Sequence, residues 1–483
     1  MITKSRADFL TVLIGRLFQI VIMMVTLRVL TTLLSPEEMG SIYIFTSIYT
    51  FFILAFISPF GKYINKHTHA WHESGVLLSN LSIYYIYLLI IACLSVLIGY
   101  YFSQFDIVSG ISLSVYLLLL FSFILFISFN QTVIPLLNML YYRISFTFLA
   151  TCTFLGILVF GYLFVILFGE SAQNWLFGMA FSNALFGIIG YIVLKNRVSE
   201  KSNNLLVIFK KITKNNLKKI LNFTIPLAVA IVFMWLQNSG YRIIIEKNIG
   251  LDFLGFFGVG MMVSIQISSV IESIVMQYLH PIYYKDITNT TLNKRKEAID
   301  RLINTVLPIY FMLALFLTFL SKHILEILVD EKYYGAYIFM AFGVWVEFFR
   351  MSTNLFENIS QSEMNTKKII YPYIVGGITT ITLIYFSSFE LEYRLLLPLS
   401  LVLGGLVTVI AMFFSMKKLI NFYISYKLLL VSFLMSIPYV SIYLIDIKSN
   451  IYSNLLIIFI FGMYFLTTVF FMYKKSLLYT VLK

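Results

Sequence analysis

The stretch Leu33-Leu34-Ser35-Pro36-Glu37-Glu38-Met39-Gly40 is a short polar turn between two long apolar runs, residues 8–33 and 41–59. Each run has about the 20 residues that a helix needs to cross the hydrocarbon core of a bilayer. So short a connection keeps both ends of the turn on one side of the membrane. The stretch therefore predicts two membrane-spanning helices that run in opposite directions.

Composition extends this interpretation to the whole chain. Of its 483 residues, 60% are hydrophobic and only 12% are charged, whereas soluble domains carry roughly 25% charged residues. The net charge of +13 could suggest a nucleic-acid partner, but the basic residues lie in short loops between apolar runs, where they act as topology signals. We therefore expect no nucleic acid. Cys93 and Cys152 both fall inside apolar runs and predict neither a disulfide nor a metal site.

Apolar runs of suitable length recur along the chain and predict about 14 transmembrane helices. The predicted spans are residues 8–33, 41–59, 76–100, 111–133, 144–168, 175–194, 220–241, 253–279, 302–320, 336–359, 369–386, 395–416, 428–445 and 455–473. A polar, basic stretch, 195–219, follows the sixth span. No loop exceeds about 25 residues, which leaves no room for a soluble catalytic domain. The expected fold class is an all-α polytopic membrane protein.

Lysine and arginine divide unevenly between alternate loops. Of the 35 basic residues, 26 fall in loops on one side and 6 in loops on the other, while Arg16, Arg28 and Arg350 lie inside predicted spans. Cytoplasmic loops are the ones enriched in Lys and Arg. The asymmetry places both termini in the cytoplasm.

The first and seventh spans end alike, which suggests an internal repeat. Arg28 precedes Gly40 by 12 residues, and Arg242 precedes Gly255 by 13. Six spans separate the two copies, so they have the same orientation in the membrane. Repeats of this kind relate two bundles by an axis along the membrane normal, with the substrate path between them.

The repeat divides the chain into four predicted parts. Residues 1–200 form an N-terminal six-helix bundle, and 201–219 form a basic cytoplasmic linker. Residues 220–418 form a second six-helix bundle, and 419–483 contribute two additional transmembrane helices. The two bundles are expected to enclose a central cavity.

These motifs carry a family resemblance. The turn at 33–40 followed by an aromatic second span resembles the polysaccharide flippases of the multidrug/oligosaccharidyl-lipid/polysaccharide exporter superfamily. The seventh span, Phe223-Thr224-Ile225-Pro226 leading to Trp235 and Tyr241-Arg242, is similar to the start of that family's second half. One departure is Tyr241, where the family pattern has an acidic residue, and it puts an ion-binding role at this point in doubt.

The resemblance implies a flippase of the O-antigen (Wzx) type in the bacterial inner membrane. Its substrate would be an undecaprenyl-diphosphate-linked oligosaccharide, an O-antigen or related repeat unit used in lipopolysaccharide or other polysaccharide biosynthesis. Expected partners are membrane lipid and, beyond the substrate, a polysaccharide polymerase and chain-length machinery. The chain would be no enzyme and would use no cofactor, with transport coupled to H⁺ or Na⁺.

Two alternatives remain open at this point. Within the superfamily, the chain could be a lipid II flippase or a multidrug–cation antiporter, and the two extra C-terminal spans favour a flippase over a typical 12-span antiporter. A membrane glycan polymerase or ligase would be an enzyme and would need a sizeable outer loop with catalytic groups. The first outer loop has fewer than about ten residues, with Glu37 and Glu38 as its only acidic pair.

Arginines are suited to a diphosphate, because the guanidinium fork pairs two oxygens and stays charged. An Arg inside a span costs roughly 2.5–3.5 kcal/mol on insertion scales, so it is expected to face protein or water. Arg16, Arg28, Arg242 and Arg350 are therefore the candidates for the diphosphate and glycan path. Arg28 lies near the end of its span, where its side chain could instead extend to the outer interface.

The tenth predicted span, 336–359, contains the most regular polar pattern. Glu347, Arg350, Asn354, Glu357 and Gln361 recur at intervals that place them within about 80° on one helix face. One interpretation is a polar track for the glycan, with Arg350 at the phosphates and Asn354 along the path. The other is a structural ion pair between Glu347 and Arg350.

Three carboxylates lie well inside spans, Glu272, Glu347 and Glu357. Each is a candidate for binding a coupling proton or sodium ion. His67, His69 and His72 form a cluster in a predicted cytoplasmic loop. An interfacial helix anchored by Trp71 explains this cluster better than a metal site does, and no metal is expected.

The basic asymmetry makes a direct prediction about topology. Reporter fusions that are active only outside the cytoplasm should be active when placed near Glu170 and inactive near Asn204, because Asn204 lies in the Lys-rich stretch. The opposite activity pattern would reverse the predicted orientation.

Overall fold

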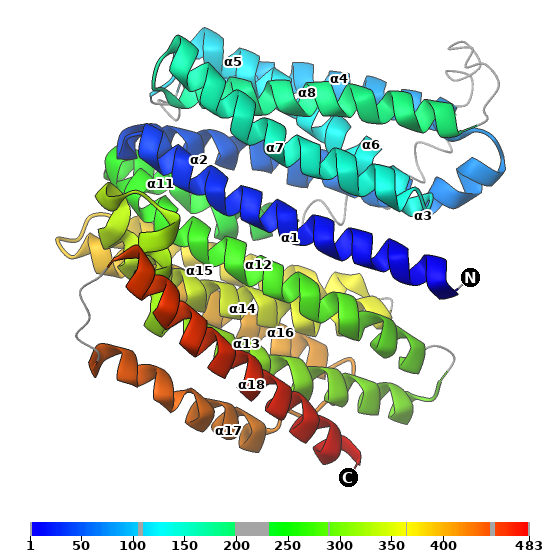
Figure 1. Cartoon of the computed structure of the whole chain (residues 1–483), viewed down its shortest axis with the longest axis vertical. Coiled ribbons are helices and arrows are strands. Elements are labelled where there is room, and N and C mark those ends of the chain that lie inside the picture. The colour runs from blue at the N-terminus through cyan, green and yellow to red at the C-terminus, as the bar shows by residue number, and fades with distance from the viewer. Residues whose placement is uncertain are drawn as a thin grey trace. The chain divides into compact units, whose positions relative to one another are not determined.

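The computed structural model describes residues 2–104, 110–198, 231–287, 290–363, 365–444 and 450–481. Over these residues the chain is helical and contains no strand (Figure 1). It divides into two compact units. The first unit comprises Met1–Trp235 and Ile249–Gly255, and the second comprises Leu236–Asn248 and Phe256–Lys483.

The helical membrane fold predicted from the sequence is confirmed. Within the described residues, 11 helices are long and apolar enough to cross a membrane. The predicted span 336–359 corresponds to a further long helix whose charged stripe lowers its hydropathy, and 428–445 corresponds to the shorter apolar helix Tyr426–Ile442. The first half of the predicted span 220–241, up to residue 230, lies outside the described residues. About 14 spans is therefore consistent with the structure.

The first unit consists mainly of eight α-helices. They are α1 (Ile2–Leu33), α2 (Pro36–Phe52), α3 (Ser58–Glu73), α4 (Leu77–Ser103), α5 (Leu113–Ser122), α6 (Ser128–Met139), α7 (Arg143–Phe168) and α8 (Ala172–Arg197). A π-helical turn, Ile53–Ile57, joins α2 to α3, and a second, Phe123–Ile127, joins α5 to α6. Each of these pairs therefore forms one continuous membrane-crossing helix, Pro36–Asn65 and Leu113–Met139.

Helices α7 and α8 pack closely because small residues line their contact (Figure 1). A Cβ added at Gly178 would lie 2.6 Å from the Cα of Gly161, so the two backbones touch directly. Trp175 covers the neighbouring surface of Gly161 and is only 1% exposed. Small residues allow this approach, which supplies van der Waals contact where lipid gives no hydrophobic force between helices.

A buried polar network also connects three helices of the first unit. The side-chain amide of Asn130 on α6 donates to the Thr153 hydroxyl on α7 and to the Asn183 carbonyl on α8, both at 3.3 Å. The Ser182 hydroxyl donates to the Thr153 carbonyl at 3.0 Å. These bonds satisfy polar groups that lipid could not.

The second unit contains α11 (Tyr241–Asn248), α12 (Leu251–Ile287, from Phe256 on), α13 (Leu292–Leu328), α14 (Tyr337–Ser362), α15 (Ile370–Ser387), α16 (Tyr393–Lys417), α17 (Tyr426–Ser436) and α18 (Ile451–Val481). Short helices connect some of them, among them a π-helical turn, Leu236–Gly240, before α11 and a 3-10 helix, Thr366–Ile369, before α15. Helix α13 is the most buried of the candidate spans.

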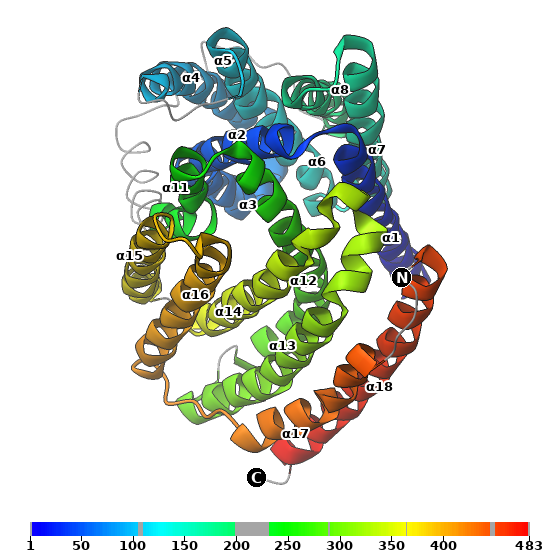
Figure 2. The same ribbon diagram turned by 90° about the vertical axis from the view of Figure 1, so that its left-hand side faces the viewer.

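The last two helices pack on α13 (Figure 2). Asn304 of α13 donates to the Tyr423 carbonyl at 2.9 Å and accepts from the Ser425 amide at 2.6 Å. These two bonds fix the loop between α16 and α17 against α13. Asn454 of α18 bonds to His323 at 2.8 Å and to Glu326 at 2.7 Å. Helices α17 and α18 therefore belong to the same compact unit as α11–α16.

The repeat seen in the sequence has the same local structure in both copies. Helix α1 ends at Leu33 and α2 begins at Pro36, with the Ser35 hydroxyl capping its first turn. Helix α11 ends at Asn248 and α12 begins at Leu251, after Gly250 with a φ of 118°. A positive φ of this kind suits only glycine well. Each copy is thus a helix, a break of two residues and a second helix.

The two copies of the repeat also touch within the first unit. A Cβ on Gly40 would lie 2.2 Å from the Leu251 carbonyl oxygen, and a Cβ on Gly255 would lie 1.8 Å from the Pro36 carbonyl oxygen. Each repeat glycine therefore packs on the backbone of the other copy. Superposition of the complete halves, with Arg28 on Arg242, stays a prediction.

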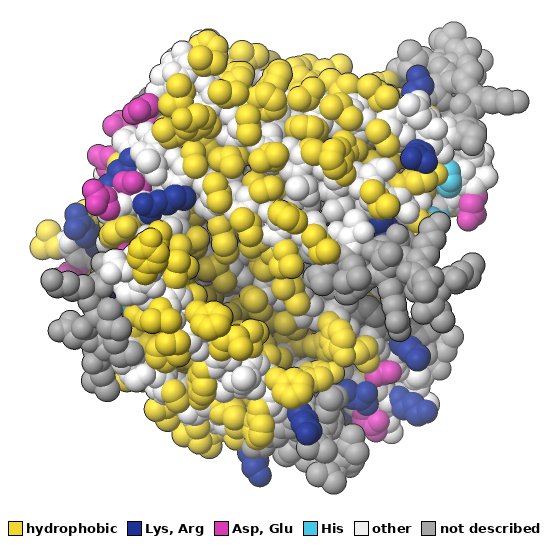
Figure 3. Space-filling view, viewed as in Figure 1, with side chains coloured by type: hydrophobic (Ala, Val, Ile, Leu, Met, Phe, Trp, Pro, Cys, Tyr) yellow, Lys and Arg dark blue, Asp and Glu magenta, His cyan; other side chains and the backbone are white. Residues whose placement is uncertain are grey.

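Apolar side chains cover most of the face drawn in Figure 3, and charged side chains gather toward the helix ends. Large exposed apolar residues occur along the spanning helices of both units, for example Leu97 and Phe168 in the first and Phe414 and Phe470 in the second. Such a surface suits lipid as the surrounding solvent.

Candidate functional site

The polar stripe of α14 is the centre of the candidate site. Arg350 lies one turn after Glu347, and its Nε donates to Glu347 Oε2 at 2.8 Å while its Nη2 lies 2.7 Å from the same oxygen. The spacing of three residues places both side chains on one helix face. The ion pair that formed one of the two interpretations of this stripe is therefore present.

Helix α12 supplies a second carboxylate to the same guanidinium. Arg350 Nη2 lies 2.9 Å from Glu272 Oε2. The other oxygen of Glu272 accepts from the side-chain amide of Asn354 at 3.0 Å. Four of the predicted site residues, Glu272, Glu347, Arg350 and Asn354, thus form one hydrogen-bonded cluster, which we call the α12–α14 charge cluster.

The charge cluster is largely enclosed by protein. Glu347 is 3% exposed, and the Arg350 and Glu272 side chains keep 25% and 16% of their surface accessible. With all three groups ionised, two carboxylates and one guanidinium leave a net charge of −1 in a setting where unbalanced charge is costly. The cluster therefore favours capture of one positive charge.

Other titratable groups lie close to the charge cluster. Tyr310 of α13 is completely buried, and its hydroxyl has no hydrogen-bond partner among the described residues. Tyr373 of α15 donates to Glu357, the next carboxylate along the same stripe of α14, at 2.8 Å. Helices α12, α13, α14 and α15 all border the cluster.

Glu357, the third predicted carboxylate, belongs to a separate polar group one turn further along α14. Its Oε2 accepts from the Tyr373 hydroxyl at 2.8 Å, and its Oε1 accepts from the Gln361 side chain at 3.1 Å. Among the described residues it forms no ion pair. The stripe predicted from helical periodicity is therefore real, but its residues have two different sets of partners.

Arg16 lies on α1 in the first unit and is exposed. Its Nη1 donates to Gln19 Oε1 at 3.3 Å, and the Gln19 amide donates to the Thr151 hydroxyl of α7 at 3.2 Å. Gln19 is only 3% exposed. This chain of polar side chains positions the guanidinium and leaves most of it open to solvent or to a ligand.

The other two predicted arginines differ in exposure. Arg28, also on α1, is half-buried, and Arg242 of α11 is 8% exposed. The Arg242 guanidinium lies 5.8 Å from the ring centroid of Tyr241, the residue that stands where the family pattern has an acidic side chain. An aromatic face can stabilise a cation at this distance.

The histidine cluster lies on α3. His67 stacks on Trp71 with ring centroids 5.6 Å apart, and its Nδ1 bonds to the Tyr63 carbonyl at 2.8 Å. Among the described residues, no group of three or more His, Cys, Asp or Glu side chains could hold a metal ion. His67 shares a helix face with Tyr63 and Trp71, whereas His69 lies near Tyr141, with ring centroids 6.0 Å apart.

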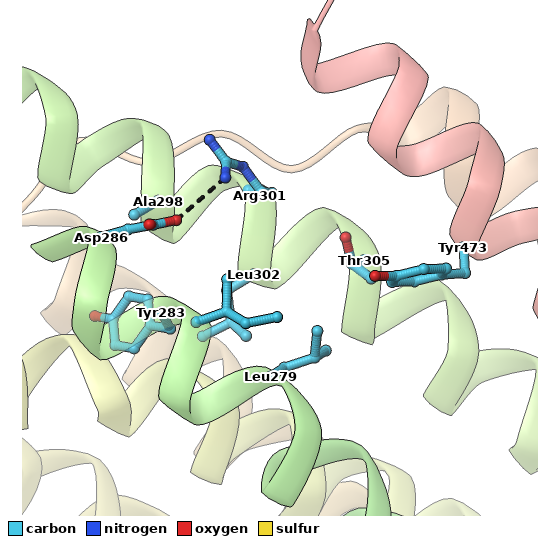
Figure 4. A pocket seen from close by; sticks show the side chains of 9 residues that line it. Leu279, Tyr283, Asp286, Ala298, Arg301, Leu302, Thr305 and Tyr473 are labelled. Atoms are coloured by element: carbon cyan, nitrogen blue, oxygen red, sulfur yellow. Dashed lines mark hydrogen bonds and ion pairs between the residues drawn. The ribbon is translucent and has the colours of Figure 1, made fainter. Parts of the chain in front are cut away.

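A small cavity of about 80 Å³ lies between α12, α13 and α18 (Figure 4). Arg301 and Asp286 form an ion pair of 3.1 Å on one side of it, and Tyr473 of α18 lies on another. The volume holds at most a few water molecules. It is too small for a sugar or a diphosphate.

Sequence reasoning did not identify several polar residues that the structure connects. Tyr310 and Tyr373 border the charged and polar groups of α14, and Gln237 donates to the Thr408 hydroxyl at 2.9 Å. Gln237 and Asn130 could have been predicted from the sequence to form hydrogen bonds, because an amide inside an apolar run requires a partner. Tyrosine gave no such signal, since this chain contains 33 of them.

The charge cluster makes a testable prediction about stability. Arg350→Met should destabilise the purified protein by about 3–5 kcal/mol, because it leaves two largely buried carboxylates without their cation. Adding Glu272→Gln and Glu347→Gln to this variant should recover much of the loss. The measurement is thermal or denaturant unfolding in detergent.

Arg301→Met provides the matched control for Arg350→Met. Its partner Asp286 lies in a more open ion pair, with side chains 44% and 33% exposed, and such pairs contribute at most about 1 kcal/mol. Equal losses for the two variants would show that the charge cluster contributes no more than a surface ion pair.

Comparison with known proteins gives this geometry a context. Residues 29–338 match the family model described as polysaccharide biosynthesis protein. No curated protein sequence matches the chain. A solved structure titled lipid II flippase MurJ, inward closed conformation, is similar with 14% identity and a TM-score of 0.64, covering 96% of this chain and 99% of that one.

A second solved structure is an inward-facing multidrug resistance MATE family transporter of the MOP superfamily. It has 12% identity and a TM-score of 0.60, and it covers 83% of this chain and 94% of its own. At these identities the structural likeness establishes the fold, and the family match over more than half of the chain establishes the family. The chain belongs to the polysaccharide biosynthesis protein family and has the fold of the multidrug/oligosaccharidyl-lipid/polysaccharide exporter superfamily.

Proposed function

We propose that this protein flips an undecaprenyl-diphosphate-linked oligosaccharide, an O-antigen or related repeat unit, outward across the bacterial inner membrane. The observation that carries the proposal is the match of residues 29–338 to the polysaccharide biosynthesis family in a chain with a flippase-like membrane fold. Flipping makes and breaks no bond. It requires a shielded polar path for the sugar and diphosphate while the prenyl tail stays in lipid.

The fold alone does not select this substrate, since a lipid II flippase and a multidrug transporter share it. The family match supports a lipid-linked glycan over a drug. Both kinds of flippase substrate combine a polar glycan with a diphosphate, so the same residue chemistry suits either. The glycan accumulated in a strain without the gene distinguishes them.

Arg16 is the residue best placed to contact the diphosphate. It is the only charged residue between Asp8 and Arg28 of α1, it is exposed, and its guanidinium donates to Gln19 through one nitrogen. The guanidinium of Arg350 already forms ion pairs with Glu347 and Glu272. A diphosphate would have to compete with two carboxylates for Arg350, which supports Arg16 as the primary phosphate contact.

The charge cluster is suited to coupling. Its net charge of −1 favours one proton or one Na⁺, and that cation would relieve the competition of Glu272 and Glu347 for Arg350. Binding that weakens the contact of Arg350 with Glu272 would loosen α12 from α14. A ligand shifts a conformational equilibrium by its differential affinity for the two states, and this cluster provides such a difference.

Arg16 substitution tests the substrate proposal. In a strain of the source bacterium that lacks this gene, Arg16→Ala should export little surface glycan, and Arg16→Lys should retain more than Arg16→Ala but less than wild type. Lysine keeps the charge but loses the bidentate fork. Surface glycan is scored with expression checked by blot, and Lys62→Ala, an exposed α3 residue, is the control that should export normally.

Normal export by Arg16→Ala would refute its diphosphate role. Accumulation of peptidoglycan precursor in the deletion strain, with surface glycan unchanged, would refute the oligosaccharide substrate and favour lipid II.

Glu272→Gln tests the coupling proposal in proteoliposomes loaded with the lipid-linked glycan from the deletion strain. Wild-type protein should flip the glycan faster under an imposed pH or Na⁺ gradient. Glu272→Gln should flip it at one rate with or without the gradient, because the cluster then has no excess negative charge. Glu297→Gln, an exposed residue of α13, should behave as wild type. A normal gradient response of Glu272→Gln would exclude the cluster as the coupling site.

A further inference from the structure

A groove in the second unit combines a cationic end with apolar walls. It has a volume of about 920 Å³ and lies where α15 begins and α16 ends. Lys367 and Lys368, in the 3-10 helix before α15, line one side of it. Lys418, the residue that follows α16, also lines it. Tertiary packing therefore brings together lysines that are about 50 residues apart in the sequence.

The lysines of the groove have no opposing charge. All three are exposed, none forms an ion pair among the described residues, and no Asp or Glu lines the groove. Glu363, the acidic residue closest in sequence to Lys367, is engaged with Arg295 at 3.1 Å. Three positive charges at one mouth create a local field that attracts an anion.

The walls of the groove are apolar and face outward. Tyr371, Ile410 and Phe414 line it and are 66%, 46% and 59% exposed. They lie on α15 and α16, both of which are long and apolar enough to cross the membrane. The groove thus has the same polarity profile as a phospholipid, charged at the membrane surface and apolar toward the bilayer interior.

The groove is held in shape by bonds between its two sides. The Ser415 hydroxyl donates to the Lys368 carbonyl at 2.7 Å, which fixes the lysine pair against α16. Deeper in the bundle, α15 and α16 pack closely, since a Cβ on Gly376 would lie 1.8 Å from the Thr408 hydroxyl oxygen. A preformed site loses less conformational entropy when it binds a ligand.

We propose that this groove binds an anionic membrane phospholipid, with the headgroup phosphate among Lys367, Lys368 and Lys418 and an acyl chain along Ile410 and Phe414. The unpaired lysines select negative headgroups over zwitterionic ones, because a zwitterion carries its own cation. The apolar walls select a lipid over a soluble phosphate. Basic pockets between spanning helices recognise anionic headgroups in this way. The site is separate from the α12–α14 charge cluster and does not depend on the transported substrate.

The test is lipid binding to the purified full-length protein by native mass spectrometry. Phosphatidylglycerol and phosphatidylcholine with identical acyl chains are titrated separately. Wild-type protein should bind phosphatidylglycerol more tightly. The triple variant Lys367→Gln/Lys368→Gln/Lys418→Gln should bind it at least about tenfold more weakly, since each lysine near a membrane surface contributes severalfold to affinity.

A matched triple variant controls for net charge. Lys285→Gln/Lys294→Gln/Lys417→Gln removes three exposed lysines near the ends of α12, α13 and α16 that are predicted to lie on the same side of the membrane. None of them lines the groove. It should keep the wild-type preference for phosphatidylglycerol. Equal losses in both triple variants, or no loss in the groove variant, would overturn the proposal.

Ala411→Trp separates a lipid from a free phosphate. Ala411 lines the groove, so a tryptophan there fills the apolar wall and leaves every lysine in place. It should weaken phosphatidylglycerol binding while leaving binding of inorganic pyrophosphate unchanged. Undiminished lipid binding by this variant would refute an acyl-chain site. Unfolding temperatures verify that each variant is folded. If Ala411→Trp fails to fold, the comparison of the two triple lysine variants still tests the proposal.

Discussion

A charge inside a bilayer must find its partner within the protein, because hydrocarbon can neither solvate it nor donate a hydrogen bond. The second unit meets this constraint with Arg350, whose guanidinium bridges Glu347 on its own helix and Glu272 on α12. Removing any one of the three groups would change the charge balance for the other two. Helices α12 and α14 are therefore coupled by electrostatics as well as by packing.

Neutral polar residues obey the same constraint and act as ties between helices. Asn130 joins α6 to α7 and α8, and Asn304 and Asn454 join α13 to the segments that pack on it. Each side-chain amide group satisfies a donor, and Asn304 and Asn454 also satisfy an acceptor, within the protein. Since lipid supplies no hydrophobic force between helices, such bonds and the close glycine contact of Gly178 with Gly161 determine which helices are neighbours.

Charge is distributed by depth along the spanning helices of the second unit. Carboxylates and Arg350 lie in the interior of α12 and α14, whereas unpaired lysines lie at the ends of α15 and α16. With all its groups ionised, the interior cluster has one more negative than positive charge, which is the basis of the proposed coupling role. The lysines at the helix ends attract anions at the membrane surface. The two charged groups of this unit therefore lie apart, one in the helix interiors and one at the helix ends.

The sequence by itself determined the membrane class, most of the helix positions and the polar face of α14. Those features depend on composition and on neighbours within one helix, which the period of 3.6 residues makes predictable. Only the tertiary structure decided that Glu272, 78 residues from Arg350, shares its guanidinium. It also decided that Gly40 packs on Leu251 and that Lys368 lies beside Lys418. Contacts between helices depend on which faces pack together, and in an apolar sequence nearly every face is chemically acceptable to its neighbours.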